Sequence, residues 1–175
     1  MELNSDNVEE DLAAATHLQM TDAVILCSKY LESSITVGNC VDILNLAELY
    51  SLSTLHTIAK IFILGSFETV SDTDQYYTLS TTQLSSLLQE NSLNITSEYL
   101  LFQTLLKWIE YNPVERESTV PLLMKNIRLP LLSGEELVEK VSLVPIMQQN
   151  RECNQLLTDA KDYNIVIGKQ SMLQT

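Results

Sequence analysis

The sequence has little of the residues that keep chains extended or flexible. Four Gly and four Pro among 175 residues exclude fibrous and linker-like classes, which are normally rich in one or both. The longest apolar run, Ile58 to Leu64, contains Lys60 and is far shorter than the roughly 20 residues of a membrane-spanning helix. Met1 and Glu2 begin no secretory signal, since neither a basic start nor an apolar stretch follows. We therefore expect a protein of the cytoplasm or nucleus that does not enter a membrane.

Basic residues are also scarce. The chain has 23 Asp and Glu against 10 Lys and Arg, a net charge of -13. Residues 1–106 carry 14 of the acids and only Lys29 and Lys60 as bases, whereas residues 107–175 carry 9 acids and 8 bases. So negative a surface repels phosphate backbones and anionic lipids within a Debye length. We expect no nucleic-acid or membrane partner, while a basic protein partner remains compatible with the charge.

Cysteine is too sparse for a disulfide framework or a thiolate metal site. Cys27, Cys40 and Cys153 lack the paired C-x-x-C spacing of zinc and redox sites. Free Cys behaves as a small core residue, so we predict three buried thiols in a reducing compartment. We expect no metal and no cofactor.

The usual motifs of catalysis are missing as well. There is no Walker loop, no G-x-G-x-x-G, no G-x-S-x-G and no H-E-x-x-H. His17 and His56 lie far apart in sequence and are expected to face solvent or cap helices. Residues 9–11 are three consecutive acids, but their position in the first turn of a helix is explained by the helix dipole alone, so they do not indicate a metal site. The residues favour a binding or scaffolding module and not an enzyme.

Apolar residues recur at three- and four-residue steps along most of the chain, which predicts an all-α fold of antiparallel helix pairs. Asp6 and Glu9 are predicted to form a capping box before the first helix, and Asn39 to cap the third. The first four apolar stripes are Val8, Leu12, Ala15 and Leu18; Val24, Cys27, Tyr30 and Leu31; Cys40, Leu44, Ala47 and Tyr50; and Leu55, Ile58, Ala59 and Phe62.

A seam between two parts is expected within residues 72–94, where turn residues and a polar stretch flank one short helix. Thr96 and Glu98 are predicted to open the most apolar helix, which ends before Pro113. Its expected core face, with Trp108 as a structural anchor, is Leu101, Leu105, Trp108 and Ile109.

The remaining segments are expected to add further helices. Ser133 and Glu136 form a sequence-level capping box, and we hypothesise that Arg128 has a structural role through a buried or half-buried ion pair with Glu98 or Glu110. The only strand candidates are Met1 to Leu3 and Ile165 to Ile167. The last two helical stripes are Val120, Leu123, Met124 and Ile127, and Cys153, Leu156, Leu157, Ala160 and Tyr163.

Several residue groups, taken in order and spacing, resemble a known family. Leu18-Gln19-Met20, then Cys27, then Asn39-Cys40, then Ala47-Glu48 with Tyr50 are similar to the end of a BTB domain running into the BACK domain of BTB-Kelch proteins. The similarity continues over nearly the whole chain, through Ser97-Glu98, Trp108, Arg116, Asn126 to Leu131, Leu137, Cys153 and Tyr163.

The resemblance implies a domain organisation. Residues 1–35 would be the last helices of a BTB domain, residues 36–165 a BACK domain, and residues 166–175 a tail or linker toward a Kelch propeller that this sequence does not contain. The dimerising part of the BTB domain would also lie outside it, and full-length family members form homodimers.

The resemblance also implies a function. Members look like substrate adaptors of a cullin-3 RING E3 ubiquitin ligase, in which the BTB domain and first BACK helices hold the cullin-3 N-terminal region. The Kelch propeller captures the protein to be ubiquitinated. The alternative is an acidic helical scaffold that binds another protein independently of cullin.

The family's cullin contact falls on the first helices of this sequence. It points to the joint of the first two helices and to the helices from Asn39 to Tyr50 and Leu55 to Phe62. For Leu44, packing inside the core is the competing interpretation, and for His17 and Gln19 it is plain exposure. The candidate contact residues are Asn7, His17, Gln19, Thr21, Asn39 and Leu44.

Overall fold

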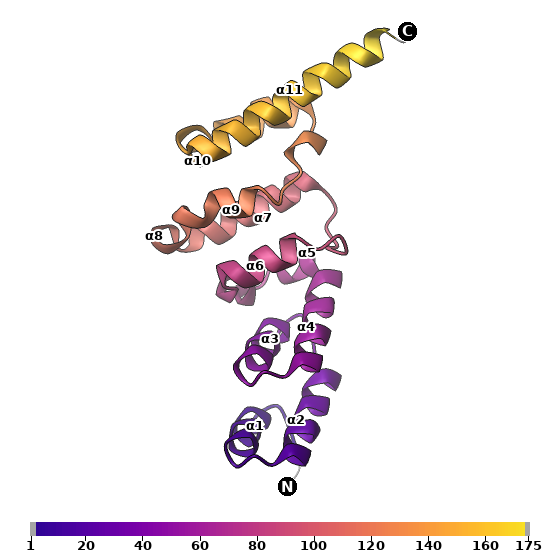
Figure 1. Ribbon diagram of the computed structural model, residues 1–175, viewed down its shortest axis with the longest axis vertical. Helices are drawn as coiled ribbons and strands as arrows, with labels where there is room; N and C mark the ends of the chain where they lie inside the picture. The colour runs from indigo at the N-terminus through magenta and orange to yellow at the C-terminus, as the bar shows by residue number, and fades with distance from the viewer. Residues whose placement is uncertain (1–2, 174–175) are drawn as a thin grey trace. The chain divides into compact units, whose positions relative to one another are not determined.

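A computed structural model describes residues 3–173, with side chains for residues 3–167. Over this range the chain forms helices and contains no strand, which confirms the all-α prediction (Figure 1). Within it, no helix combines the length and apolar character that crossing a bilayer requires. Met1 and Glu2, two of the three residues of one strand candidate, lie outside the described residues, and Leu3 is in no strand.

The chain divides into two compact units. The first extends to Leu79 and includes Ser92–Asn94, and the second contains Ser80–Asn91 and the chain from Ile95 onward. Asn94 joins the segment Ser92–Asn94 to the rest of the first unit through two hydrogen bonds to the end of α4. Its backbone N–H donates to the Leu64 carbonyl at 2.9 Å, and its side-chain amide donates to the Gly65 carbonyl at 2.9 Å. The division falls within the seam expected from the sequence.

The first unit is built from two helical hairpins. The hairpins α1–α2 and α3–α4 stack in Figure 1, with α2 in contact with α4. Each hairpin buries small and medium apolar side chains that allow its two helices to approach closely. The elements are α1 (Val8–His17), α2 (Thr21–Ser33), α3 (Cys40–Leu49), α4 (Ser53–Gly65), α5 (Phe67–Val70) and the 3₁₀ helix η1 (Asp74–Thr78).

The two hairpins repeat one another at a spacing of 32 residues. Helices α1 and α3 each have 10 residues, and α2 and α4 each have 13. Buried residues match at this spacing, so one pattern of side chains forms both hairpin cores. The matched buried pairs are Val8 and Cys40, Leu12 and Leu44, Ala15 and Ala47, Cys27 and Ala59, and Leu31 and Ile63.

Most of the predicted stripes are buried, but Leu18 is 65% exposed. Leu18 follows the last residue of α1, where the helix has already ended, so its side chain no longer follows the helical spacing. Three predicted caps are also wrong. Asp6 forms no capping box, Asn39 makes no side-chain cap, and Ser97, not Thr96, caps its helix by accepting from the Leu100 N–H at 3.1 Å.

The asparagines before α1 and α3 instead close the preceding turns. Asn7 Oδ1 accepts from the Asn4 N–H at 2.8 Å, and Asn39 Oδ1 accepts from the Thr36 N–H at 2.7 Å. A side chain turned back in this way cannot also reach forward to the first turn of its helix. Local side-chain bonding of this kind competes with capping.

The second unit is centred on α7, whose buried face includes the predicted Leu101, Leu105, Trp108 and Ile109. Trp108 is 1% exposed, and the Arg116 guanidinium lies 3.9 Å from its ring centroid while donating to the Trp108 carbonyl at 2.6 Å. The elements are α6 (Thr81–Leu88), α7 (Glu98–Tyr111), α8 (Pro113–Arg116), η2 (Glu117–Thr119), α9 (Val120–Met124), η3 (Leu129–Leu131), the π-helix η4 (Glu136–Lys140), η5 (Val141–Leu143), α10 (Pro145–Gln149) and α11 (Arg151–Leu173).

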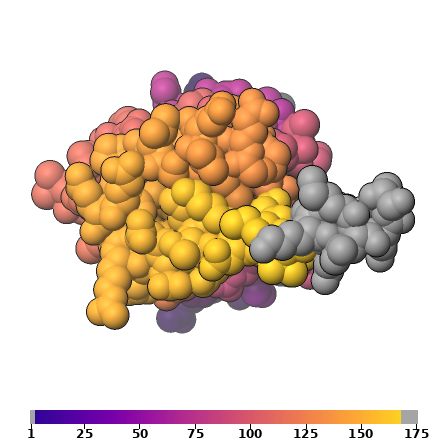
Figure 2. Space-filling model, turned by 90° about the horizontal axis from the view of Figure 1, so that it is seen from above, coloured from indigo at the N-terminus to yellow at the C-terminus, as the bar shows by residue number. Residues whose placement is uncertain are grey.

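The C-terminal helix corrects two expectations. Ile165–Ile167 is not a strand, because α11 runs through it, and Tyr163 is 50% exposed and not a core residue. Asn164 holds this part of α11 by donating to the Leu132 carbonyl at 3.2 Å. Figure 2 shows the coloured part of α11, orange to yellow, lying along the orange segment before it, with which α11 is in contact.

Arg128 pairs with Glu98, one of the two acids considered, but the guanidinium is not buried. The Arg128 side chain is 72% exposed and the Glu98 side chain 10%. Glu98 Oε1 accepts from Arg128 Nε at 2.7 Å, and Glu98 Oε2 accepts from the Arg128 backbone N–H at 3.1 Å. The carboxylate, and not the guanidinium, is therefore the buried partner that joins the start of α7 to the segment after α9.

We predict that Glu98→Ala lowers the free energy of unfolding by about 1–3 kcal/mol, because it removes the backbone and side-chain bonds together. Arg128→Met should cost less than about 1 kcal/mol, since an exposed guanidinium loses little and the backbone bond remains. Chemical denaturation monitored by circular dichroism measures both. Lys125→Met is the control, because it removes an exposed pair with Glu152. Equal losses for Glu98→Ala and Lys125→Met would contradict the assignment.

Candidate protein-interaction site

The joints within the two hairpins have the same backbone geometry. Gln19 and Ser51 adopt φ of 56° and 55°, the left-handed region that L side chains seldom occupy. The next residue closes the turn: the Met20 N–H donates to the Ala15 carbonyl and the Leu52 N–H to the Ala47 carbonyl, each at 2.8 Å. Both joints are thus Schellman motifs, which usually have Gly at the left-handed position.

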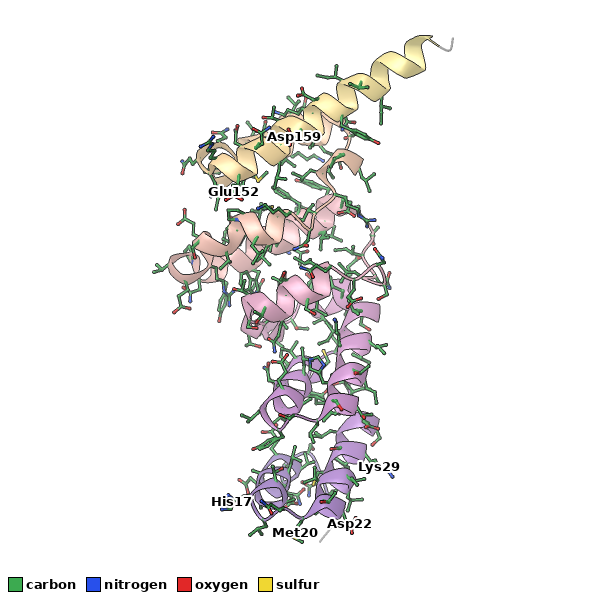
Figure 3. All side chains as sticks on the ribbon, viewed as in Figure 1. His17, Met20, Asp22, Lys29, Glu152 and Asp159 are labelled. Atoms are coloured by element: carbon green, nitrogen blue, oxygen red, sulfur yellow. The ribbon has the colours of Figure 1, made fainter. Side chains whose placement is uncertain are left out.

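The joint between α1 and α2 places three of the candidate residues in solvent. His17 ends α1, Gln19 occupies the left-handed position, Thr21 begins α2, and all three are exposed. Figure 3 shows His17, Met20 and Asp22 gathered at this end of the hairpin, with Lys29 farther along α2. These side chains are therefore available to a partner.

Apolar side chains accompany the joint. Leu18, Met20 and Leu26 are 65%, 53% and 60% exposed, and they line a groove of about 350 Å³ between α1 and α2. Asp11 is the only charged residue of this lining. Contiguous exposed apolar surface of this kind is typical of interaction sites.

A second, larger groove lies between α2 and the start of α4. Its volume is about 460 Å³, and α2 contributes Ile25, Lys29 and Glu32 to its lining, while the second joint contributes the residues from Ser51 to Leu55. Thr21 and Ile25 stand four residues apart on α2 and so share a helix face, which connects the first joint to this groove. We call the exposed joint residues and this groove the α2–α4 surface.

The other three candidate contact residues stabilise the fold of the first unit. Leu44 is 2% exposed, so it is a core residue, which corrects its assignment as a contact. Asn7 and Asn39 are half-buried, and their side-chain oxygens bond to the preceding turns. Asn39 Nδ2 also donates to the Ser34 carbonyl at 3.0 Å, so it fixes the connection between α2 and α3.

The groove-lining residues Ile25, Lys29 and Glu32 and the second joint were not identified from the sequence. The signal that could have found them is the 32-residue repeat, which pairs Gln19 with Ser51 and Thr21 with Ser53. It was obscured because only a few of the matched positions, such as Leu12 and Leu44, carry identical residues.

The titratable groups of this unit are ordinary core and surface groups. Burial raises the pKa of the Cys27 thiol, and the Asp11 carboxylate raises it further; burial also raises the pKa of the Cys40 thiol. Both thiols therefore stay protonated and unreactive at neutral pH. His56 lies 3.3 Å from Glu48, an ordinary surface pair. In the described part of the chain, no group of three or more His, Cys, Asp or Glu side chains could hold a metal ion.

Stacked hairpins that expose their joints beside a groove define a class of helical protein-binding modules. Comparison with known proteins identifies the family of the chain. The family model described as "BTB And C-terminal Kelch" (BACK) matches residues 40–142. The chain therefore belongs to the BTB-BACK-Kelch family, as the resemblance in its sequence implied.

Kelch-like proteins are similar to the chain over almost its whole length. Kelch-like protein 31 of Homo sapiens is 35% identical over 94% of this chain, Kelch-like protein 28 of Mus musculus 32% over 99%, and Kelch-like protein 13 of Homo sapiens 31% over 100%. The matched region covers only 26%, 31% and 27% of these relatives. The chain thus spans about a quarter to a third of their length.

We predict that Gln19→Gly raises the free energy of unfolding by about 0.5–1 kcal/mol, because Gly adopts the left-handed conformation without strain. Urea denaturation at neutral pH measures the change. His17→Gly is the matched control two residues away, where the backbone is helical and Gly should cost about 0.5–1 kcal/mol. A loss at position 19 as large as the loss at position 17 would refute the strained-joint assignment.

Proposed function

We propose that the chain is a substrate-adaptor segment of a cullin-3 RING ubiquitin ligase and that its α2–α4 surface binds the cullin-3 N-terminal region. The observation that carries the proposal is the position of the exposed joint and groove on the helices where the family resemblance locates the cullin contact. Membership in the BTB-BACK-Kelch family supports it. The bond-making chemistry belongs to other subunits, so the chain itself is not an enzyme.

The domain assignment is part of this proposal. We infer that α1 and α2 are the last helices of a BTB domain and that the BACK domain begins near residue 36. The start of the family match at residue 40 supports that boundary. Helices α1 to α4 nevertheless form one compact unit, so the interaction surface combines helices from both domains. A bound cullin segment would therefore contact helices of both domains.

The composition of the surface indicates how a partner would bind. Ile25, which is 47% exposed, supplies apolar lining that a partner could cover, whereas Lys29 and Glu32 place opposite charges one helical turn apart. Burial of apolar area would supply most of the affinity, at about 25 cal/mol per Å² before binding costs. The charges would fix the register of the bound segment.

The alternative is an acidic helical scaffold that binds a different, basic protein. The 14 acids and 2 bases of residues 1–106 favour it, because an acidic surface speeds association with a basic partner. It predicts binding that falls steeply with salt and that does not depend on the groove. The Ile25→Asp variant distinguishes the two functions, because only cullin binding is expected to depend on the groove.

We predict that the chain binds the purified cullin-3 N-terminal region and that Ile25→Asp weakens binding at least about tenfold, since it removes an exposed apolar side chain of the groove lining and places a carboxylate under the bound partner. Isothermal titration calorimetry measures the affinity. Ile61→Asp is the matched control, because Ile61 is 63% exposed on α4 and lies outside the groove lining. It should change the affinity less than about twofold.

Two results would contradict the cullin proposal. One is equal weakening by both isoleucine variants, which would show that binding does not depend on the groove; an acidic scaffold for a basic partner would instead bind no more weakly with each added carboxylate. The other is no binding by the chain and none by a chimera that carries the missing N-terminal part of a BTB domain ahead of residue 1.

A further inference from the structure

The two joints of the first unit share one backbone conformation. His17 and Leu49 are the last residues of α1 and α3, and the left-handed residue comes two positions after each. The N–H of that left-handed residue donates to the Thr16 carbonyl at 3.1 Å in the first joint and to the Glu48 carbonyl at 3.2 Å in the second. We call residues 17–21 and 49–53 the joint edge. A partner that contacts only the backbone of this edge cannot distinguish one joint from the other.

The joints lie at the same end of their hairpins, and the hairpins stack in the same orientation. Figure 1 shows α1 and α3 on the left and α2 and α4 on the right, with α2 in contact with α4. The groove between α2 and α4 reaches the second joint, because residues 51–55 line it. A partner segment in this groove is therefore next to the joint edge.

Side chains have to distinguish the joints, and one matched pair does so. At the 32-residue spacing, four of the five pairs are either two mainly apolar side chains or two uncharged polar side chains. In the fifth pair, the imidazole of His17 is matched by the aliphatic side chain of Leu49. The four similar pairs are Leu18 and Tyr50, Gln19 and Ser51, Met20 and Leu52, and Thr21 and Ser53.

Both members of the differing pair are accessible to a partner. Leu49 is 70% exposed, the highest value among the large apolar residues described in the first unit. The His17 side chain is exposed as well, and its ring nitrogens can donate or accept hydrogen bonds. A single exposed leucine is common on protein surfaces, but Leu49 occupies the position at which the two joints differ in chemistry.

We propose that Leu49 is a specificity-determining residue, which together with His17 fixes the register of the cullin-3 N-terminal region on the joint edge. This inference rests on the proposed function. A polar group of the partner meets His17, and an apolar side chain of the partner meets Leu49. A partner shifted by one hairpin would bring its polar group onto Leu49, where that group loses water without gaining a hydrogen bond.

Isothermal titration calorimetry with the cullin-3 N-terminal region tests the proposal on the chain, or on the chimera if only the chimera binds. Leu49→His should weaken binding about tenfold, because an apolar contact is replaced by a polar group. The decisive variant exchanges the two residues, His17→Leu with Leu49→His. It preserves composition and charge, yet we expect it to weaken binding at least about tenfold, because each partner group then meets the wrong side chain.

Leu143→His is the matched control, since Leu143 is 67% exposed and belongs to the second unit. It should change the affinity less than about twofold. Each variant should keep the melting temperature of the unmodified chain within about 3 °C, because the substituted side chains are exposed.

Three results would overturn the inference while the unmodified chain still binds cullin. They are wild-type affinity of the exchange variant, wild-type affinity of Leu49→His, and equal weakening by Leu143→His and Leu49→His. The first would show that composition matters and position does not. Absence of binding by both the unmodified chain and the chimera would instead remove the proposed function, and this inference with it.

Discussion

The contact between α2 and α4 is the interaction on which the first unit depends. A two-helix hairpin has apolar residues on more than the one face that its own helices cover, so a single hairpin leaves part of its core surface in water. Stacking a second hairpin of the same design removes that surface from solvent. The 32-residue spacing keeps both hairpins in the same register, with Leu31 and Ile63 in matching core positions. The groove lined by Ile25 and Leu55 is the part of this stack that remains open.

The joints show how the fold creates exposed surface. A Schellman turn ends each first helix abruptly, and its left-handed residue, Gln19 or Ser51, has a non-glycine side chain that must face outward. Retaining a strained residue at both joints costs stability of order 1 kcal/mol each, a pattern that is common where a position also serves recognition. The geometry thus links a local backbone requirement to the surface proposed for cullin.

Much of the fold could be predicted from the sequence because apolar spacing determines which helix face is buried. The helix around Trp108 and the capping box at Ser133 and Glu136 illustrate this. The errors occur where spacing carries no information: at Leu18, where the helix has ended; at Asn39, where two bonding directions compete; and at Ile165–Ile167, where β-branched residues continue α11. Of the candidate site, the exposed joint residues could be placed from the resemblance. The groove could not, because it is made by residues about 30 positions apart that only the stack brings together.

Hydrogen exchange measured by mass spectrometry, with and without the cullin-3 N-terminal region, tests most directly whether a partner occupies the open part of the hairpin stack. The account predicts slower exchange in the peptides covering residues 17–25 and 50–56, with no change in α7 or α11. Protection confined to the second unit, or unchanged exchange at both joints under saturating cullin, would contradict it.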